Sequence, residues 1–220
     1  MLTLYSYFRS SAAFRVRIAL ALKGLDYDTV AVHLLKNGGE QHHSDFLSIN
    51  PYGLLPALRI EDDSEDVRVL TQSLAILEYL EEEYPQAPLL PDTAYERAQV
   101  RGLALAVACD IHPLNNLRVT QYLKSELNIS DNAKQAWYKQ WIERGFAAIE
   151  YELSTQDAKR FCFGEQVSLA DVCLIPQVYN ARRFNNCHPE RFRHITSVYE
   201  HCMSMPAFQH AAPESQPDAA

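Results

Sequence analysis

The sequence predicts an α/β domain followed by an all-α helical domain. Three observations support this prediction: strand-like and helix-like patterns alternate over residues 1–84, three prolines fall within residues 85–91, and beyond them only the apolar spacing of helices recurs. A chain of 220 residues is long enough for two domains with cores of their own.

The beginning of the chain predicts a βαβ unit. Alternating apolar residues indicate a strand over Leu2–Tyr7, helical spacing indicates a helix over Ser11–Lys23 that Gly24 ends, and alternation resumes over Tyr27–Leu34.

The sequence patterns of the rest of this domain predict a short helix, a hairpin and a final helix. The short helix covers Ser44–Ile49, and the hairpin strands Ala57–Ile60 and Val67–Leu70 flank the acidic turn Glu61–Asp66. A helix over Ser73–Tyr84 ends the domain. The order βαβαββα, with one right-handed crossover and an antiparallel edge, is the layout of a thioredoxin-like domain.

Prolines mark the boundary between the domains, because they block both helix and ladder hydrogen bonds. We therefore expect a first domain at 1–84, a linker at 85–91 and a helical domain at 92–220. Helical spacing in the last of these covers Thr93–Ala108, Leu114–Leu127, Asn132–Leu153, Leu169–Phe184 and Pro189–Met203. From Ala211 onward we expect a loosely packed tail.

Composition excludes several classes of protein. With 20 basic and 28 acidic residues, a net charge of −8 and a pI near 5.5, the chain lacks the basic face that nucleic acid requires. Arginines interrupt the first apolar segment and no apolar stretch approaches the ~18 residues of a membrane span, so we expect a soluble, cytoplasmic protein. Its five scattered cysteines include no C-x-x-C pair, which favours reduced thiols and no metal.

The segment Arg9-Ser10-Ser11 lies where the first strand meets the first helix. Free N–H groups and the helix dipole favour an anion there. One hydroxyl is enough to cap the helix, so two exceed what a cap requires, and Ser11 is the better placed of the two to cap or to assist. The pair Gln72-Ser73 also begins a helix, and its hydroxyl either holds a carboxylate or simply caps.

Other motifs have both structural and functional interpretations. Leu55-Pro56 precedes a strand, so it is either an ordinary turn or a cis bond that exposes the Leu55 backbone to an extended peptide. Ser168-Leu169-Ala170-Asp171 has the spacing of a capping box, which makes Asp171 structural. Arg118, Arg183 and His112 are ordinary surface or packed residues unless the fold directs them at Ser10. In that case the two arginines suit a carboxylate ligand, because the planar guanidinium binds both carboxylate oxygens.

Specific residues of this chain resemble one known family. The matching segments are Tyr5–Leu20, Asn50-Pro51, Leu55-Pro56, Gln72–Leu80, Ser168–Asp171 and the closing Gln216-Pro217-Asp218. Together they resemble the zeta class of glutathione S-transferases over nearly the whole chain. The class typically has Ser-Ser-Cys at the start of the first helix, whereas this chain has Ala12 in the third position.

The resemblance implies a fold, a reaction and partners. The fold is that of glutathione transferases, an α/β thioredoxin-like N-terminal domain plus an all-α C-terminal helical bundle, assembled as a homodimer through the helices after Pro91. The reaction is glutathione-dependent cis–trans isomerisation of maleylacetoacetate, a small dicarboxylate of aromatic amino-acid catabolism, to fumarylacetoacetate. Alternatives are maleylpyruvate isomerisation, general zeta-class transferase activity, and a non-catalytic adaptor.

The resemblance also implies the site residues. Ser10, Ser11 and Arg9 are expected in catalysis, and Arg9, Arg118 and Arg183 in substrate binding. The residues expected to bind glutathione are Ser10, Ser11, Arg15, Gln41, Leu55 through its backbone, Gln72, Ser73, His112 and Asn116.

The implied chemistry needs a thiolate. A thiol with a pKa of ~8.5 is only ~3% ionised at pH 7, and lowering that pKa by ~2 units takes ~2.7 kcal/mol. A hydrogen bond from a hydroxyl to an ion contributes ~1.5–3 kcal/mol and a helix N-terminus ~0.3–1 kcal/mol. The Ser10 hydroxyl and the N-terminus of the first helix are therefore together sufficient to lower the pKa of the thiol by this amount.

Overall fold

The computed structural model describes residues 1–61, 67–155, 160–184, 188 and 190–219. Its contacts divide the chain into two compact units, the first formed by Met1–Pro88 with Ser204–Ala220 and the second by Leu89–Met203. The division falls inside the predicted linker. The last residues, which we expected in the helical domain, instead group with the first unit.

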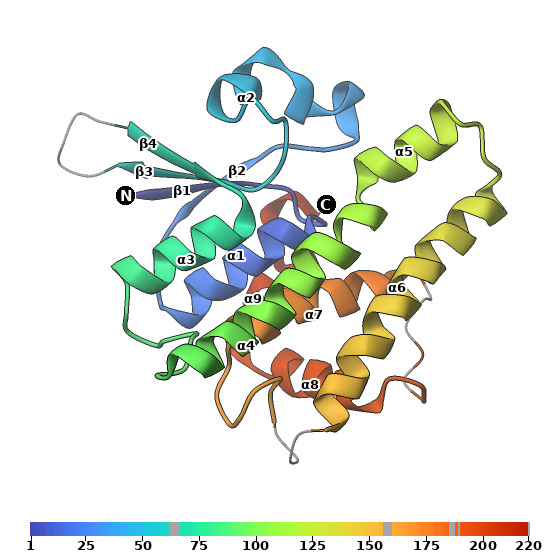
Figure 1. Ribbon diagram of the computed structural model, residues 1–220. Coiled ribbons are helices and arrows are strands. Elements are labelled where there is room, and N and C mark those ends of the chain that lie inside the picture. The colour runs from blue at the N-terminus through green and yellow to red at the C-terminus, as the bar shows by residue number, and fades with distance from the viewer. Residues whose placement is uncertain (62–66, 156–159, 185–187, 189, 220) are drawn as a thin grey trace. The chain divides into compact units, whose positions relative to one another are not determined.

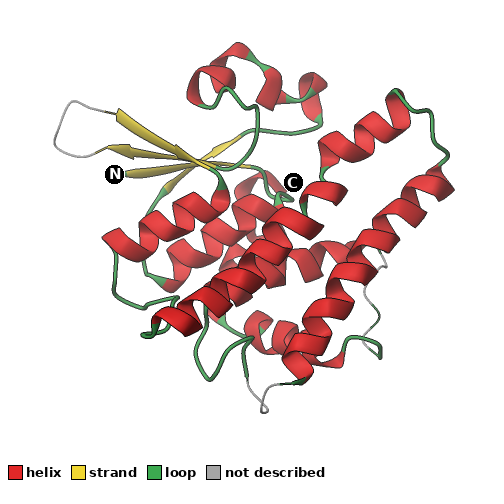
Figure 2. Ribbon diagram, in the orientation of Figure 1, coloured by secondary structure: helices red, strands yellow, loops and turns green. Residues whose placement is uncertain are grey.

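Four strands form the sheet of the first unit (Figure 2). They are β1 (Leu2–Ser6), β2 (Asp28–Ala31), β3 (Ala57–Glu61) and β4 (Val67–Thr71), in the order β2-β1-β3-β4. β1 pairs in parallel with β2, and β3 pairs antiparallel with both β1 and β4. This topology confirms the predicted crossover and hairpin; residues 62–66 of the predicted acidic turn lie outside the described part of the chain.

Three helices cover this sheet (Figure 1). α1 (Ser11–Leu22) and α3 (Ser73–Glu83) lie side by side on one face, where Phe14, Ile18 and Leu77 are fully buried. α2 (Ser44–Ile49) lies on the opposite face, and its Phe46 ring is centred 6.0 Å from the Tyr5 ring. Residues of β1 alternate between these two faces because side chains of a strand have a period of two.

The end of the chain is packed, and the expectation of a loose tail was wrong. α9 (Pro206–Ala211) lies along α1 and buries Phe208 completely (Figure 1). Two short 3₁₀ turns follow at Pro213–Ser215 and Pro217–Ala219. Ala211, Ala212 and Pro213 are themselves buried, so an Ala/Pro/Ser-rich composition did not indicate loose packing here.

The second unit contains five longer helices among its described residues, as the spacing predicted. They are α4 (Ala94–Leu105), α5 (Leu117–Ser125), α6 (Asp131–Ser154), α7 (Leu169–Arg183) and α8 (Arg193–Met203). α4 continues into a π-helical segment, Ala106–Ile111, and a 3₁₀ turn, Pro113–Asn115. None of the described helices is long and apolar enough to cross a membrane.

The helix α7 begins with the predicted capping box. The Ser168 N–H and hydroxyl each donate to Asp171 Oδ2 at 2.8 Å, and the Cys162 N–H donates to Oδ1 at 2.8 Å. Burial raises the pKa of the Asp171 carboxyl, and the hydrogen bonds oppose this rise. Asp171 therefore has the structural role that its spacing indicated.

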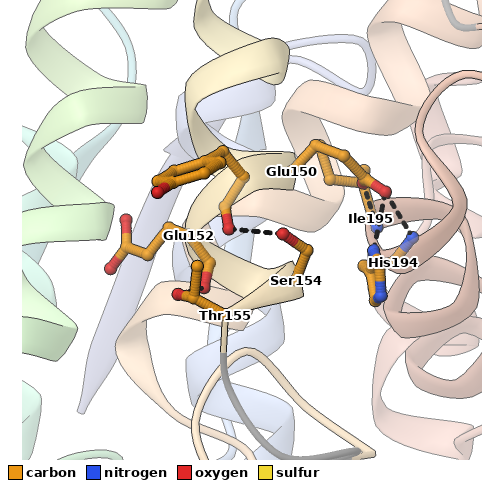
Figure 3. Close-up of polar contacts among 7 residues, drawn as sticks. Glu150, Glu152, Ser154, Thr155, His194 and Ile195 are labelled. Atoms are coloured by element: carbon orange, nitrogen blue, oxygen red, sulfur yellow. Dashed lines mark hydrogen bonds and ion pairs between the residues drawn. The ribbon is translucent and has the colours of Figure 1, made fainter.

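A carboxylate from another helix holds the start of α8 (Figure 3). Glu150 of α6 accepts hydrogen bonds from the backbone N–H groups of His194, at 2.9 Å, and Ile195, at 3.0 Å. The His194 ring Nδ1 lies 2.8 Å from the same carboxylate. A negative charge at a helix N-terminus satisfies N–H groups that have no partner within the helix.

Candidate active site

The first helix begins at Ser10, which is its N-cap. Ser10 Oγ accepts a hydrogen bond from the Ala13 N–H at 3.2 Å, and the Ser10 carbonyl accepts one from Phe14 at 2.8 Å. We had expected Ser11 to be the better placed cap. The structure reverses this expectation, since Ser11 is already the first helical residue and is buried.

Capping leaves the Ser10 hydroxyl proton available. Among the residues that the structure describes, the contact with Ala13 is the only hydrogen bond of this side chain, and in it the hydroxyl is the acceptor. A serine hydroxyl has one proton to donate as well as lone pairs. Ser10 can therefore cap the helix and donate to an anion at the same time.

The neighbours of Ser10 differ in exposure. Arg9 is exposed, and its guanidinium lies 4.7 Å from the centre of the Phe8 ring. Ala12, which stands where the zeta class typically has a cysteine, is partly exposed in the first turn of α1. An exposed cation and a helix-capping hydroxyl thus lie on consecutive residues.

Two of the expected glutathione ligands contact each other. Arg15 of α1 donates from Nη1 to Ser73 Oγ at 3.1 Å, and both residues are buried. Because Ser73 Oγ accepts this bond, its own proton remains able to donate outward. Gln72, the N-cap of α3, is exposed and has φ of 68°, an unusual backbone conformation for a residue other than glycine.

Gln41 is buried beside a glycine. Its Nε2 lies 3.0 Å from His42 Nε2, while its Oε1 is buried without a hydrogen-bond partner among the described residues. A Cβ on Gly39, which has φ of 97°, would come within 2.8 Å of the Gln41 amide. Gly39 therefore lets the Gln41 amide lie against the backbone. Gln41 Oε1 is an acceptor that a ligand N–H could satisfy.

Asn50 shapes the loop that carries Leu55. Its Nδ2 donates to the Leu54 carbonyl at 2.7 Å, and its Oδ1 accepts from the Tyr52 N–H at 3.1 Å. The Leu55–Pro56 bond is cis, which is one of the two interpretations that the sequence allowed. Since Asn50 is almost fully buried, this loop has a fixed inner side.

In the second unit, His112 and Asn116 lie together at the start of α5. Asn116 is the N-cap, with Oδ1 accepting from the Arg118 N–H at 3.2 Å, and its Nδ2 lies 3.4 Å from His112 Nε2. Arg118 is exposed in the first turn of the helix. Three of the predicted site residues, His112, Asn116 and Arg118, therefore lie at the capped N-terminus of α5.

Arg183, the last residue of α7, is held by a neighbour that the sequence did not reveal. Asn180 Oδ1 accepts from Arg183 Nη2 at 2.9 Å, and Asn180 Nδ2 donates to the Tyr138 hydroxyl at 2.9 Å. Burial raises the pKa of Tyr138, and the Arg183 charge opposes this rise. Asn180 stands one helical turn before Arg183, and this spacing was the available signal.

Two further residues without a predicted role hold the Phe8 peptide, two residues before Ser10. Arg17 is fully buried and donates to the Phe8 carbonyl at 3.0 Å, and Asp218 accepts from the Phe8 N–H at 2.9 Å. Both belong to segments that carried the family resemblance. Their side-chain partners were not predictable, since Asp218 and Phe8 are 210 residues apart.

Two family models match the chain. They are the N-terminal domain of glutathione S-transferase, over residues 9–83, and its C-terminal domain, over residues 131–203.

Relatives match over nearly the full length. A probable maleylacetoacetate isomerase of Vibrio cholerae is 50% identical over 99% of this chain and 98% of its own length. Among solved structures, the holo structure of a maleylpyruvate isomerase, described as a bacterial zeta-class glutathione S-transferase, has a TM-score of 0.92 at 43% identity, covering 99% of this chain and 100% of that one.

A third similar protein is a maleylacetoacetate isomerase from Anaeromyxobacter dehalogenans. Its structure with dicarboxyethyl glutathione and citrate bound in the active site has a TM-score of 0.88 at 40% identity, covering 100% of this chain and 98% of that one.

The chain therefore belongs to the glutathione S-transferase family, and its relatives place it in the zeta class. The predicted family and fold are confirmed. The predicted glutathione-dependent isomerase agrees with what these relatives are named and with what one of them binds.

Proposed function

We propose that the protein is a glutathione-dependent cis–trans isomerase that converts maleylacetoacetate to fumarylacetoacetate, a step of aromatic amino-acid catabolism. The observation that carries this proposal is the Ser10 hydroxyl, which caps α1 and keeps its proton available to an anion. The relatives named maleylacetoacetate isomerase, which match nearly end to end, support the choice of reaction.

The first unit offers the groups that a glutathione tripeptide needs. Buried Gln41 Oε1 is an acceptor without a partner among the described residues, and Ser73 Oγ is oriented by Arg15. We assign Gln72 and Ser73 to the γ-glutamyl end and the Leu55 backbone to the cysteinyl part. When bound, glutathione supplies a thiolate that adds to the double bond of the substrate and leaves after rotation about the resulting single bond.

Ser10 lowers the pKa of the bound thiol in this proposal. Its hydroxyl donates to the thiolate, and the N-terminus of α1 adds a favourable field. A hydrogen bond to an ion contributes ~1.5–3 kcal/mol, which corresponds to about one to two pKa units. Because Ser10 Oγ accepts the Ala13 N–H, its hydroxyl is also polarised toward stronger donation.

The arginines hold the acid groups of the substrate. Arg9, Arg118 and Arg183 are all exposed, and Arg183 also donates to Asn180 Oδ1. Carboxylates suit the planar fork of a guanidinium, and the enolate that forms during addition carries further negative charge. Cations on an otherwise acidic protein favour a small dianionic substrate.

The test measures turnover of maleylacetoacetate and maleylpyruvate, each with and without glutathione. We expect turnover that depends on glutathione and is higher with maleylacetoacetate. Higher turnover of maleylpyruvate favours the alternative isomerase, which a similar structure bearing that name supports. Activity on halogenated aromatics alone indicates a general transferase, and absence of glutathione binding at millimolar concentration indicates a non-catalytic adaptor.

Assembly and location follow the same family analogy. We propose a cytoplasmic homodimer formed through the helices after Pro91. Light scattering at micromolar concentration should give twice the mass of the chain, and a monomeric mass contradicts the dimer.

Substitution of the two serines tests the assignment of Ser10. Ser10→Ala should raise the pKa of bound glutathione and lower turnover ~10- to 100-fold, in line with loss of ~1.5–3 kcal/mol, while glutathione affinity stays within a few-fold. Ultraviolet absorbance of the thiolate against pH gives this pKa. Ser11→Ala is the matched control, and a rise in the thiol pKa in that variant alone reverses the two assignments.

A further inference from the structure

The end of the chain contacts the segment that leads to Ser10. Asp218 Oδ2 accepts a hydrogen bond from the Phe8 N–H at 2.9 Å, across 210 residues of sequence. Asp218 lies in the last 3₁₀ turn, Pro217–Ala219, which follows α9 and its contact with α1 (Figure 1). The tail therefore places a carboxylate on the loop that carries the proposed catalytic hydroxyl.

Arg17 holds the same peptide segment from the other side. Its Nη2 donates to the Phe8 carbonyl at 3.0 Å, its Nη1 to Ser6 Oγ at 3.0 Å, and its Nε to the Ala211 carbonyl at 2.9 Å. Burial lowers the pKa of Arg17 to about 10, while the charge of Asp218 opposes this shift. One guanidinium thus joins β1, the loop and the end of α9.

These contacts leave little freedom to the backbone between β1 and α1. The Phe8 N–H is held by Asp218, the Phe8 carbonyl by Arg17, and the Tyr7 carbonyl accepts the Ser10 N–H at 2.8 Å. A catalytic group held within about 0.5 Å of its productive position depends on such supporting hydrogen bonds. These bonds hold the backbone from which the Ser10 side chain projects, and the Ala13 N–H holds the hydroxyl oxygen itself.

We propose that Asp218, together with Arg17, is a positioning residue that fixes the Phe8 peptide and thereby aims the Ser10 hydroxyl at the glutathione thiol. This inference rests on the proposed function, because it requires Ser10 to stabilise the thiolate. Asp218 acts through the loop and not on the thiol, so its effect must appear in the properties of Ser10.

The experiment measures the pKa of the glutathione thiol bound to the intact protein, by thiolate absorbance against pH, together with kcat and the Kd for glutathione. Asp218→Ala removes the acceptor of the Phe8 N–H. We expect the thiol pKa to rise by about half a unit to one unit, which lowers the thiolate fraction below that pKa about three- to tenfold. The Kd should change less than about threefold, since Gln41, Ser73 and Leu55 are untouched.

Two further variants separate positioning from anchoring of the tail. Asp218→Asn retains an oxygen that can accept from the Phe8 N–H, so its thiol pKa should stay closer to the wild type than that of Asp218→Ala. Gln216→Ala removes bonds from Gln216 Nε2 to the His210 carbonyl, at 2.8 Å, and the Ala212 carbonyl, at 3.0 Å, without touching the loop. It should lower the midpoint of thermal unfolding and leave the thiol pKa unchanged.

Several results overturn the inference. A wild-type thiol pKa in Asp218→Ala shows that the contact only anchors the tail, and an equal rise in Gln216→Ala shows general loosening. Equal rises in Asp218→Asn and Asp218→Ala show that the bond to Phe8 is not responsible. Ser10→Ala separates failure of this inference from failure of the proposed function. A wild-type thiol pKa in Ser10→Ala contradicts the proposed function as well, whereas a raised thiol pKa leaves only the role of Asp218 in question.

Discussion

Ser10 combines a structural role, capping α1, with the role that we propose for it in the reaction. As the N-cap of α1 it accepts the Ala13 N–H, a contact that typically stabilises a protein by ~1 kcal/mol, and its remaining proton is available to a thiolate. The sequence predicted a capping hydroxyl at this junction but favoured the wrong serine, Ser11. Which serine caps depends on the backbone angles of Ser10, φ of −69° and ψ of 112°, which place it just outside the helix.

At the same scale, Asn180 should control substrate binding through Arg183. Asn180→Ala removes the acceptor at 2.9 Å from Arg183 Nη2 and leaves the Tyr138 hydroxyl without its donor. We expect the KM for the acid substrate to rise about three- to tenfold, and that of Arg183→Ala to rise more, because loss of a charge-assisted bond to a carboxylate is worth ~1.5–3 kcal/mol. The thiol pKa of bound glutathione should not change in either variant.

The neighbouring Arg182 provides the control for this prediction. Its guanidinium stacks on Tyr199 at 4.2 Å from the ring centre and lies 3.6 Å from Glu200, so it is occupied within the helical unit. Arg182→Ala should lower the free energy of unfolding while the KM stays near that of the wild type. A larger KM effect in Arg182→Ala than in Arg183→Ala contradicts the assignment of Arg183.

Among the helices, α6 is fitted closely to the π-helical segment Ala106–Ile111. A Cβ on Gly145 would lie 2.3 Å from the Ile111 side chain, so this glycine permits the close approach. We expect Gly145→Ala to lower the free energy of unfolding by about 1–3 kcal/mol, as overpacking of a core does. Urea denaturation measures this change.

Gly102 of α4 is the matched control for Gly145, because beyond its chain neighbours and the nearby backbone of α4 its added Cβ would meet no described atom within 4 Å. Gly102→Ala should stabilise the protein by about 0.5–1 kcal/mol, since alanine is the better helix former. Equal effects of the two substitutions contradict the packing argument.

Helix α6 carries two glutamates whose side chains point in different directions (Figure 3). Glu150 turns toward His194 and Ile195 and holds the start of α8, whereas Glu152 points away from them and burial raises its pKa. Glu150→Ala should lower the free energy of unfolding by about 1–3 kcal/mol, because two backbone donors lose a charged acceptor. Thermal or urea denaturation provides the measurement.

Glu152→Gln completes this comparison. It removes a carboxylate that is disfavoured by partial burial, so the free energy of unfolding should stay within about 0.5 kcal/mol of the wild type or rise slightly. Destabilisation by Glu152→Gln as large as that by Glu150→Ala contradicts the assignment of the cap to Glu150.

Local patterns predicted most elements of the fold but few of the contacts between them. Hydrophobic spacing identified the four strands and every helix of more than eight residues, and the hydroxyl–carboxylate spacing identified the Asp171 cap. The π-helical segment was missed because its sequence reads as a continuation of α4. Capping of α8 by Glu150 was missed because the two groups are 44 residues apart.

At the scale of the whole molecule, contacts between residues far apart in the sequence determine features that local sequence patterns do not predict. The predicted site residues are divided between the two units, and within the first unit Arg15 meets Ser73 across 58 residues. The closing Gln216-Pro217-Asp218 carried the family resemblance without an assigned role, and its contact with Phe8 is the observation from which we propose one. Loop closure over such distances depends on the assembled core and leaves no periodic signal.

Buried thiols should make the stability of the whole protein fall at alkaline pH. Burial and the nearby Asp171 carboxylate raise the pKa values of Cys162 and Cys202, while unfolded cysteine ionises near pH 8.5. A raised folded pKa gives stability that is fully present below the unfolded pKa and is lost as pH rises above it. The free energy of unfolding should therefore fall from about pH 8.5 upward, by at most ~1.4 kcal/mol per pH unit for each thiol.

Urea denaturation at intervals from about pH 7.5 to 9.5 measures this slope below the range in which tyrosine ionises. Cys202→Ala should make the slope shallower, and Cys162→Ala combined with Cys202→Ala shallower still. Cys109 is exposed, so among Cys109, Cys162 and Cys202 it should be the thiol that a disulfide reagent modifies first in the native protein. An alkaline slope in the double variant equal to that of the wild type shows that other groups are responsible.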